Sequence, residues 1–126
     1  MKIVATIAVV VVAVVHIFIS VVEIFLWENP IVYQRLGFTA DVAKQVAPIV
    51  QNAGLYNSFI AAGLIWGAFT KSDSLPIRLF FLACVVVAGI FGALTLKETT
   101  LVLQTLPASV ALIFVWLAHT QSKAKG

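Results

Sequence analysis

The first apolar run of the chain reads IVATIAVVVVAVVHIFISVVEIFLW and covers residues 3–27. Four polar side chains interrupt it, and they are Thr6, His16, Ser20 and Glu23. A helix of this length extends about 36 Å at 1.5 Å per residue, whereas the hydrocarbon core of a bilayer is about 30 Å thick. The run therefore predicts a membrane-spanning helix with some tilt.

A secretory signal peptide is the competing interpretation of an apolar run that follows Lys2. The apolar part of a signal peptide has only about 7–15 residues and leads to a small-residue cleavage site. This run is longer, and it ends in Trp27-Glu28-Asn29-Pro30, which is typical of an interfacial aromatic residue followed by a helix stop. We therefore expect the segment to be retained as a span.

The composition agrees with a membrane protein. The chain has 126 residues, of which 62% are hydrophobic and 10% are charged, and its mean hydropathy is +1.10. An average soluble domain is about half apolar and about a quarter charged. A small water-facing core cannot hold this surplus of apolar side chains, so we expect a single transmembrane domain over residues 1–126 with the lipid bilayer as its main partner.

Three further apolar runs follow, at about residues 49–69, 77–96 and 101–119. Each has close to the ~20 residues that a spanning helix needs, whereas a membrane β-strand would need only about 10 residues of alternating character. The short connections 70–76 and 97–100 favour antiparallel neighbours. The prediction is an all-α integral membrane four-helix bundle with up-down-up-down topology.

One sizeable loop is expected, between Pro30 and Pro48. Within it, Thr39-Ala40-Asp41-Val42-Ala43-Lys44 has the pattern of an N-capped helix, because a threonine hydroxyl accepts a hydrogen bond from the first free N–H groups. The sequence therefore predicts a short amphipathic helix in the first loop, lying at the membrane interface.

The distribution of Lys and Arg predicts the orientation, since cytoplasmic loops carry more of these residues. The four predicted spans put two groups on opposite sides: Lys2, Lys71, Arg78, Lys123 and Lys125 on one, and Arg35, Lys44 and Lys97 on the other. This excess favours both termini in the cytoplasm, with the Pro30–Pro48 loop on the opposite side. Insertion in both orientations stays open because the excess is small.

Polar side chains inside the predicted spans form the candidate site. In the first span, the successive intervals from His16 through Ser20 and Glu23 to Trp27 are 4, 3 and 4 residues. This spacing places the four side chains on one helical stripe. The predicted ligand-binding residues are His16, Ser20, Glu23, Trp27, Asn52, Tyr56, Asn57 and Gln104.

The alternating directions of the spans put all these residues in the same half of the membrane. Glu23 is expected about 6 Å inside the boundary, Tyr56 about 9 Å, and His16 near mid-depth, at 1.5 Å per residue. The opposite halves are almost purely aliphatic and aromatic. This asymmetry predicts one polar pocket that opens outward, with His16 at its floor.

Three functions fit these residues. The first is binding or transport of a small molecule, which the titratable Glu23 and His16 favour. The second is a structural or accessory membrane subunit, in which the polar residues only hold helices together at about 0.6 kcal/mol for each hydrogen bond. The third is a membrane enzyme on a lipid-like or quinone-like substrate, with His16 and Glu23 as acid and base and Asn52, Tyr56 and Gln104 polarising an oxygen.

Other classes find no support in the sequence. The Lys and Arg residues are scattered singly, so no nucleic-acid partner is expected. Cys84 is the single cysteine, which excludes an intrachain disulfide and a metal site built from cysteine pairs. No nucleophile motif or phosphate-binding loop is present, and we expect no metal, no cofactor and, on balance, no enzyme.

Small residues recur at intervals of four in two spans. Gly63 and Gly67 form a GxxxG pair, and Ala88 and Gly92 repeat the spacing in the third span. Such pairs let helix backbones approach closely. The sequence leaves open whether they meet within one chain or between the chains of a homo-oligomer.

Several segments together carry a family resemblance: His16 with Glu23 and Trp27, Gln51-Asn52-Ala53-Gly54-Leu55-Tyr56-Asn57, Ala61-Ala62-Gly63-Leu64, the run from Phe80 to Ile90 with Gly92, and Gln104 with Pro107. By these the chain resembles the domain of unknown function 1304 family of small bacterial four-span membrane proteins. The resemblance covers nearly the whole chain. It implies the fold and an inner-membrane location, and it implies no activity.

Overall fold

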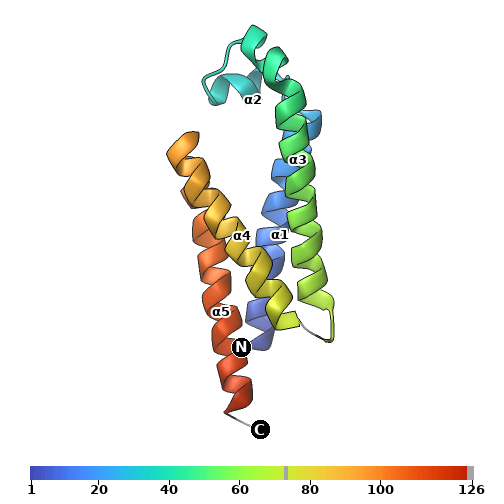
Figure 1. Cartoon of the computed structure of the whole chain (residues 1–126), viewed down its shortest axis with the longest axis vertical. Helices are drawn as coiled ribbons and strands as arrows, with labels where there is room; N and C mark the ends of the chain where they lie inside the picture. Colours follow the sequence, from blue (N-terminus) through green and yellow to red (C-terminus); the bar gives the residue numbers. More distant parts are fainter. Residues whose placement is uncertain (73, 125–126) are drawn as a thin grey trace. The chain divides into compact units, whose positions relative to one another are not determined.

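A computed structural model of the protein describes residues 1–72 and 74–124. Helices make up most of this part of the chain, and it contains no strand. The elements in chain order are α1 (Lys2–Phe25), α2 (Pro30–Arg35), α3 (Ala40–Phe69), α4 (Ser74–Thr95), the π-helix η1 (Leu101–Thr105) and α5 (Leu106–Lys123) (Figure 1). The prediction of an all-α protein is therefore confirmed.

In the part of the chain that the structure describes, three helices are long and apolar enough to cross a membrane. They are Lys2–Phe25, Ser74–Thr95 and the continuous Leu101–Lys123. Helix α3 is not among them, although it has 30 residues, because Gln51, Asn52 and Asn57 lower the hydropathy of its central part. The structure thus supports a membrane protein with helical spans. Whether the chain has the predicted four spans depends on whether α3 crosses the membrane.

The first loop differs from the prediction. The helix that begins at Ala40 does not end as a short amphipathic piece before Pro48 but continues through Pro48 to Phe69. Proline removes one backbone hydrogen bond and disturbs the preceding turn, yet Ala43 and Ala47 on this turn are buried. Packing of that face supports the helix across the proline, so the predicted separate helix in the loop is wrong.

A helix that the sequence analysis missed, α2, lies in the same loop. The side chain of Asn29 accepts a hydrogen bond from the backbone N–H of Ile31 at 3.0 Å, and Pro30 occupies the first helical position. This is the usual chemistry of a helix start. The segment interpreted as a stop of the first span is therefore also the start of the next helix.

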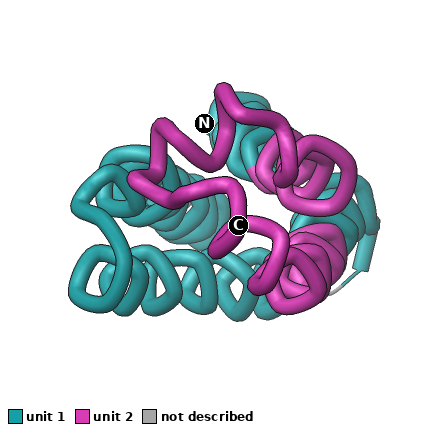
Figure 2. The backbone as a smooth tube through the Cα atoms, turned by 90° about the horizontal axis from the view of Figure 1, so that it is seen from above, with its two compact units in different colours: residues 1–15, 60–126 teal, residues 16–59 magenta. Residues whose placement is uncertain are grey.

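The described chain forms two compact units, drawn in different colours in Figure 2. Unit 1 contains residues 1–15 and 60–126, of which 73 and 125–126 are outside the described part, and unit 2 contains residues 16–59. Helices α1 and α3 each contribute one part to each unit. The two units are described separately below.

Four helices contribute to the core of unit 1. Its fully buried members are mostly alanine and valine, and they include Ala5 and Val9 of α1, Leu64 of α3, Leu82 of α4 and Ala111 of α5. Larger apolar side chains, such as Phe69, Val87 and Leu94, are exposed on the same helices. Small residues inside and large ones outside are typical of helices that pack closely and face lipid.

Helices α4 and α5 lie side by side in unit 1 (Figure 1), and Gly89 of α4 packs closely against η1, which leads into α5. A Cβ atom at Gly89 would lie 2.8 Å from the backbone nitrogen of Thr105 in η1. The hydroxyl of Thr100 donates to the Gly89 carbonyl at 2.9 Å. The glycine therefore permits the contact, and the threonine holds the connection between the helices in place.

Unit 2 has its own small core around Trp27. The other buried members are Tyr33 of α2 with Ala43 and Ala47 of α3. Gly37 stands between the two helices with a φ of +85°, a conformation that side-chain-bearing residues rarely adopt. This glycine allows the sharp turn that returns the chain from α2 to α3.

We predict that Gly89→Ala destabilises the protein by about 1–3 kcal/mol, because the added methyl group meets backbone that must move. Thermal unfolding of the detergent-purified protein measures the effect. The neighbouring Ala88 is exposed, so Ala88→Val adds more atoms and should leave the melting temperature within about one degree. Equal melting temperatures for Gly89→Ala and the wild type would contradict the close approach.

Candidate functional site

The centre of the candidate site is a hydrogen bond between α1 and α3 in unit 2. The side-chain amide of Asn57 donates to Oε2 of Glu23 at 2.8 Å, and both side chains are half-buried. A carboxylate on an otherwise apolar helix needs such a partner, because losing its hydration is costly. The amide supplies one hydrogen bond and no charge, so the carboxylate keeps the capacity to accept further bonds or to face a cation.

Gly54 explains why the two helices come so close at this point. A Cβ atom there would lie 2.9 Å from Cβ of Glu23 and 3.2 Å from the backbone oxygen of Ser20. Ser20 itself is 6% exposed. The contact therefore brings together Ser20 and Glu23 of α1 with Gly54 and Asn57 of α3.

Trp27 closes one end of this contact. Its indole Nε1 donates to the carbonyl of Ala43 at 2.8 Å, and its ring meets Phe38 edge to face at a centroid distance of 5.5 Å. The side chain is 4% exposed. Trp27 thus ties the end of α1 to the start of α3.

The remaining predicted residues divide into two groups. His16 is assigned to unit 2 and is 2% exposed, so it is a buried side chain of α1. Asn52 and Tyr56 belong to α3 but are exposed, and Tyr56 packs against the ring of Phe59 at 6.2 Å. The structure therefore does not bring Asn52 and Tyr56 onto the face of α3 that holds Asn57.

Gln104 lies in unit 1 and not in unit 2. It is part of η1, and its Cβ atom is near Gly89 of α4. The neighbouring Thr105 has a buried hydroxyl that has no hydrogen-bond partner in the described part of the chain. Short π-helical turns are frequent at functional sites, and this one is followed by Pro107 in the first turn of α5.

Sequence reasoning missed two of the residues that organise these contacts. In the sequence, Gly54 stands out only within the segment Gln51–Asn57 that carries the family resemblance, although a glycine between polar residues of a span indicates close helix packing. Arg78 was interpreted only as a topology signal, whereas its Nε and Nη2 atoms donate to the carbonyls of Gly67 and Ala68 at 2.6 and 2.9 Å. Its position just after a short connection could have predicted a role at the end of α3.

Metal binding gains no support from the geometry. Among residues 1–72 and 74–124, no group of three His, Cys, Asp or Glu side chains could hold a metal ion. The group available at Glu23 is a carboxylate beside the side-chain amide of Asn57. It can accept hydrogen bonds from, or pair with the charge of, a small molecule.

Comparison with known proteins places these features in a family. The profile of the protein of unknown function family DUF1304 matches residues 10–116, a range that contains all eight predicted site residues. The uncharacterized protein YpaA of Lactococcus lactis subsp. lactis (strain IL1403) is 31% identical over 70 residues, which cover 56% of this chain and 59% of that protein. No solved structure matches the chain.

We predict that Trp27→Phe costs about 1 kcal/mol of unfolding free energy, because the ring contacts remain and one buried hydrogen bond is lost. Unfolding by SDS titration of protein in mixed micelles measures this difference. The matched control is Trp66→Phe, since Trp66 is 61% exposed. If both substitutions have the same effect, the bond to Ala43 does not stabilise unit 2.

Proposed function

The chain belongs to the DUF1304 family, and from this and the geometry at Glu23 we propose that it is a four-span membrane protein that binds a small cationic or hydrogen-bond-donating molecule. In this proposal α3 is the second span, in addition to the three described helices that are apolar enough to cross a membrane. Of the polar side chains that lower its hydropathy, Asn57 bonds to Glu23 of α1, while Gln51 and Asn52 are exposed. Transport of that molecule is the finer form of the same proposal.

One observation carries the binding proposal. Glu23 is a half-buried carboxylate that accepts a hydrogen bond from the neutral amide of Asn57. A purely structural contact between helices is served by two neutral side chains, whereas a carboxylate inside a span is costly and is usually functional. The negative charge is therefore the feature that a ligand would use.

A second candidate, a structural or accessory subunit, is favoured by Gly54. The close approach at this glycine and the hydrogen bond to Asn57 are what interhelical packing requires. In that case Glu23 acts only as a hydrogen-bond acceptor, and its charge has no use. Substitutions that separate charge from hydrogen bonding distinguish the two candidates.

We predict that Glu23→Gln abolishes ligand binding and leaves the protein folded, because glutamine still offers a carbonyl oxygen to Asn57. The matched variant Asn57→Ala keeps the charge, loses about 0.6 kcal/mol of stability and retains the ligand. Native mass spectrometry of the detergent-purified proteins measures co-purifying small molecules. A ligand that stays on Glu23→Gln, or no ligand on the wild type together with a larger partner, would support the structural subunit.

The orientation is part of the proposal and has its own test. If the chain crosses a bacterial plasma membrane four times with both termini in the cytoplasm, Ser72 lies inside and Glu98 outside. If the N-terminus is cytoplasmic but α3 does not cross, both positions are reversed. We predict that Glu98→Cys reacts with a membrane-impermeant maleimide in intact spheroplasts and that Ser72→Cys reacts only after lysis. Both substitutions are made in a Cys84→Ser background, because Cys84 is the single native cysteine. The reversed pattern would contradict this topology, because it requires either an inverted four-span chain or an α3 that does not cross.

A further inference from the structure

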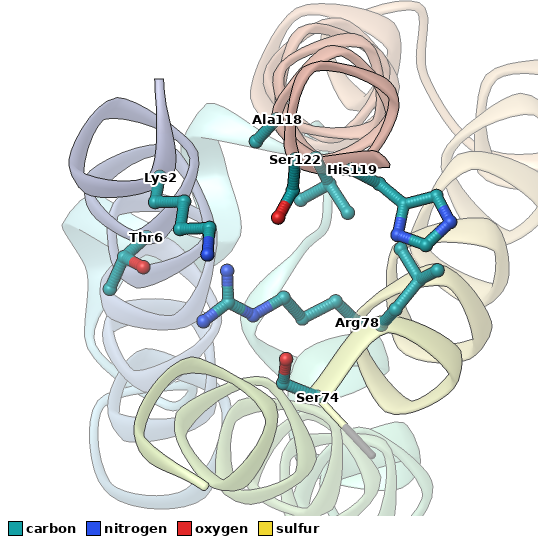
Figure 3. Close-up of a pocket in the computed structure, with 9 residues that line it drawn as sticks. Lys2, Thr6, Ser74, Arg78, Ala118, His119 and Ser122 are labelled. Carbon is teal, nitrogen blue, oxygen red and sulfur yellow. The ribbon is translucent and has the colours of Figure 1, made fainter. Parts of the chain in front are cut away.

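A pocket of about 390 Å³ lies in unit 1, and none of the residues that line it belongs to the site proposed at Glu23. It is formed by the first turns of α1 and α4 and the last turns of α5 (Figure 3). Its polar lining consists of Lys2, Thr6, Ser74, Arg78, His119 and Ser122. These side chains are cations, hydroxyls and an imidazole, which is the set of groups that bind anions in proteins.

Two positive charges face the same space. Figure 3 shows the amino group of Lys2 and the guanidinium of Arg78 pointing toward one another across the pocket. No carboxylate is among the described residues that line it, and Asp73, which precedes α4 in the sequence, is outside the described part. Like charges repel, and the repulsion is larger where little water separates them. An anion between the two groups would replace this repulsion with two attractions.

Arg78 is held in a fixed position for such a contact. Its bonds to the carbonyls of Gly67 and Ala68 fix the plane of the guanidinium, and these bonds also satisfy the last turn of α3. Guanidinium is a rigid planar donor with five N–H groups. Two nitrogen atoms of Arg78 therefore stabilise the end of α3, and they hold the guanidinium in position beside Lys2.

The other polar groups suit the oxygen atoms of a phosphate. The side chains of Thr6, Ser74 and Ser122 each offer a hydroxyl donor. Ser74 is also the first residue of α4, and the start of a helix has free N–H groups and a partial positive charge. α5 ends here with its carbonyl groups, and Lys123 in its last turn offsets their partial negative charge.

The position of the pocket agrees with the chemistry. It lies at the ends of the three helices that are long and apolar enough to cross a membrane, which is the level at which lipid headgroups lie. We propose that the pocket formed by Lys2, Arg78 and the hydroxyls of α1, α4 and α5 binds a phosphate group, carried by an anionic lipid or present as free phosphate. Basic pockets between membrane helices recognise lipid phosphates in this way.

The test compares two lipids that differ only in the phosphate. Detergent-purified full-length protein is titrated with dioleoylphosphatidic acid or with dioleoylglycerol, and native mass spectrometry measures the bound fraction. We predict binding of the phosphatidic acid alone and a loss of about tenfold in affinity for Lys2→Gln, which removes one charge-assisted contact and leaves Arg78 to stabilise α3. Lys71→Gln is the matched control, because Lys71 is exposed in unit 1 and does not line the pocket.

The possible outcomes distinguish a lipid headgroup from free phosphate, and two of them would overturn the proposal. Competition by inorganic phosphate that is lost in Lys2→Gln would identify a free anion as a ligand, and tight lipid binding without such competition would identify the headgroup. Equal binding of dioleoylglycerol would overturn the proposal, as would equal affinities of Lys2→Gln and Lys71→Gln. Far-ultraviolet circular dichroism of both variants shows that they are folded.

Discussion

An excess of apolar surface is the constraint on which the rest of the structure depends. Large side chains such as Phe18, Val87 and Leu94 are exposed on the helices, while alanine and valine fill the core of unit 1. In a bilayer each backbone polar group has to be satisfied within the protein, and helices achieve this segment by segment. Stability must then come from close packing of small residues, because lipid tails are as apolar as the side chains themselves.

Under this constraint, a polar group inside a span either forms a hydrogen bond or lowers the stability of the protein. Glu23 accepts from Asn57, Trp27 donates to the carbonyl of Ala43, and Thr100 donates to that of Gly89. Two of these contacts lie at a glycine, Gly54 or Gly89, where a side chain would keep the helices apart. The same few residues therefore determine how the helices meet and where the proposed ligand site has its charge.

The sequence predicted what depends on hydropathy and missed what depends on contacts. The helices α1, α4 and α5 begin and end within a few residues of the predicted spans, because apolar runs define them. The continuation of α3 through Pro48 could not be predicted, since it depends on which face of the helix is buried. The pairing of Glu23 with Asn57 rather than Tyr56 needs the rotation of α3 about its axis. The meeting of Lys2 and Arg78 follows from the antiparallel order and was in principle predictable.

The most direct measurement on this account is a double-mutant cycle for Glu23 and Asn57. Unfolding free energies of the wild type, Glu23→Ala, Asn57→Ala and the double variant are measured in mixed micelles by SDS titration. We predict a favourable coupling of about 0.6–1.7 kcal/mol, from the average to the maximum measured for hydrogen bonds between membrane helices. A coupling of zero would mean that Asn57 does not hold the carboxylate, and the proposed site would lose its centre.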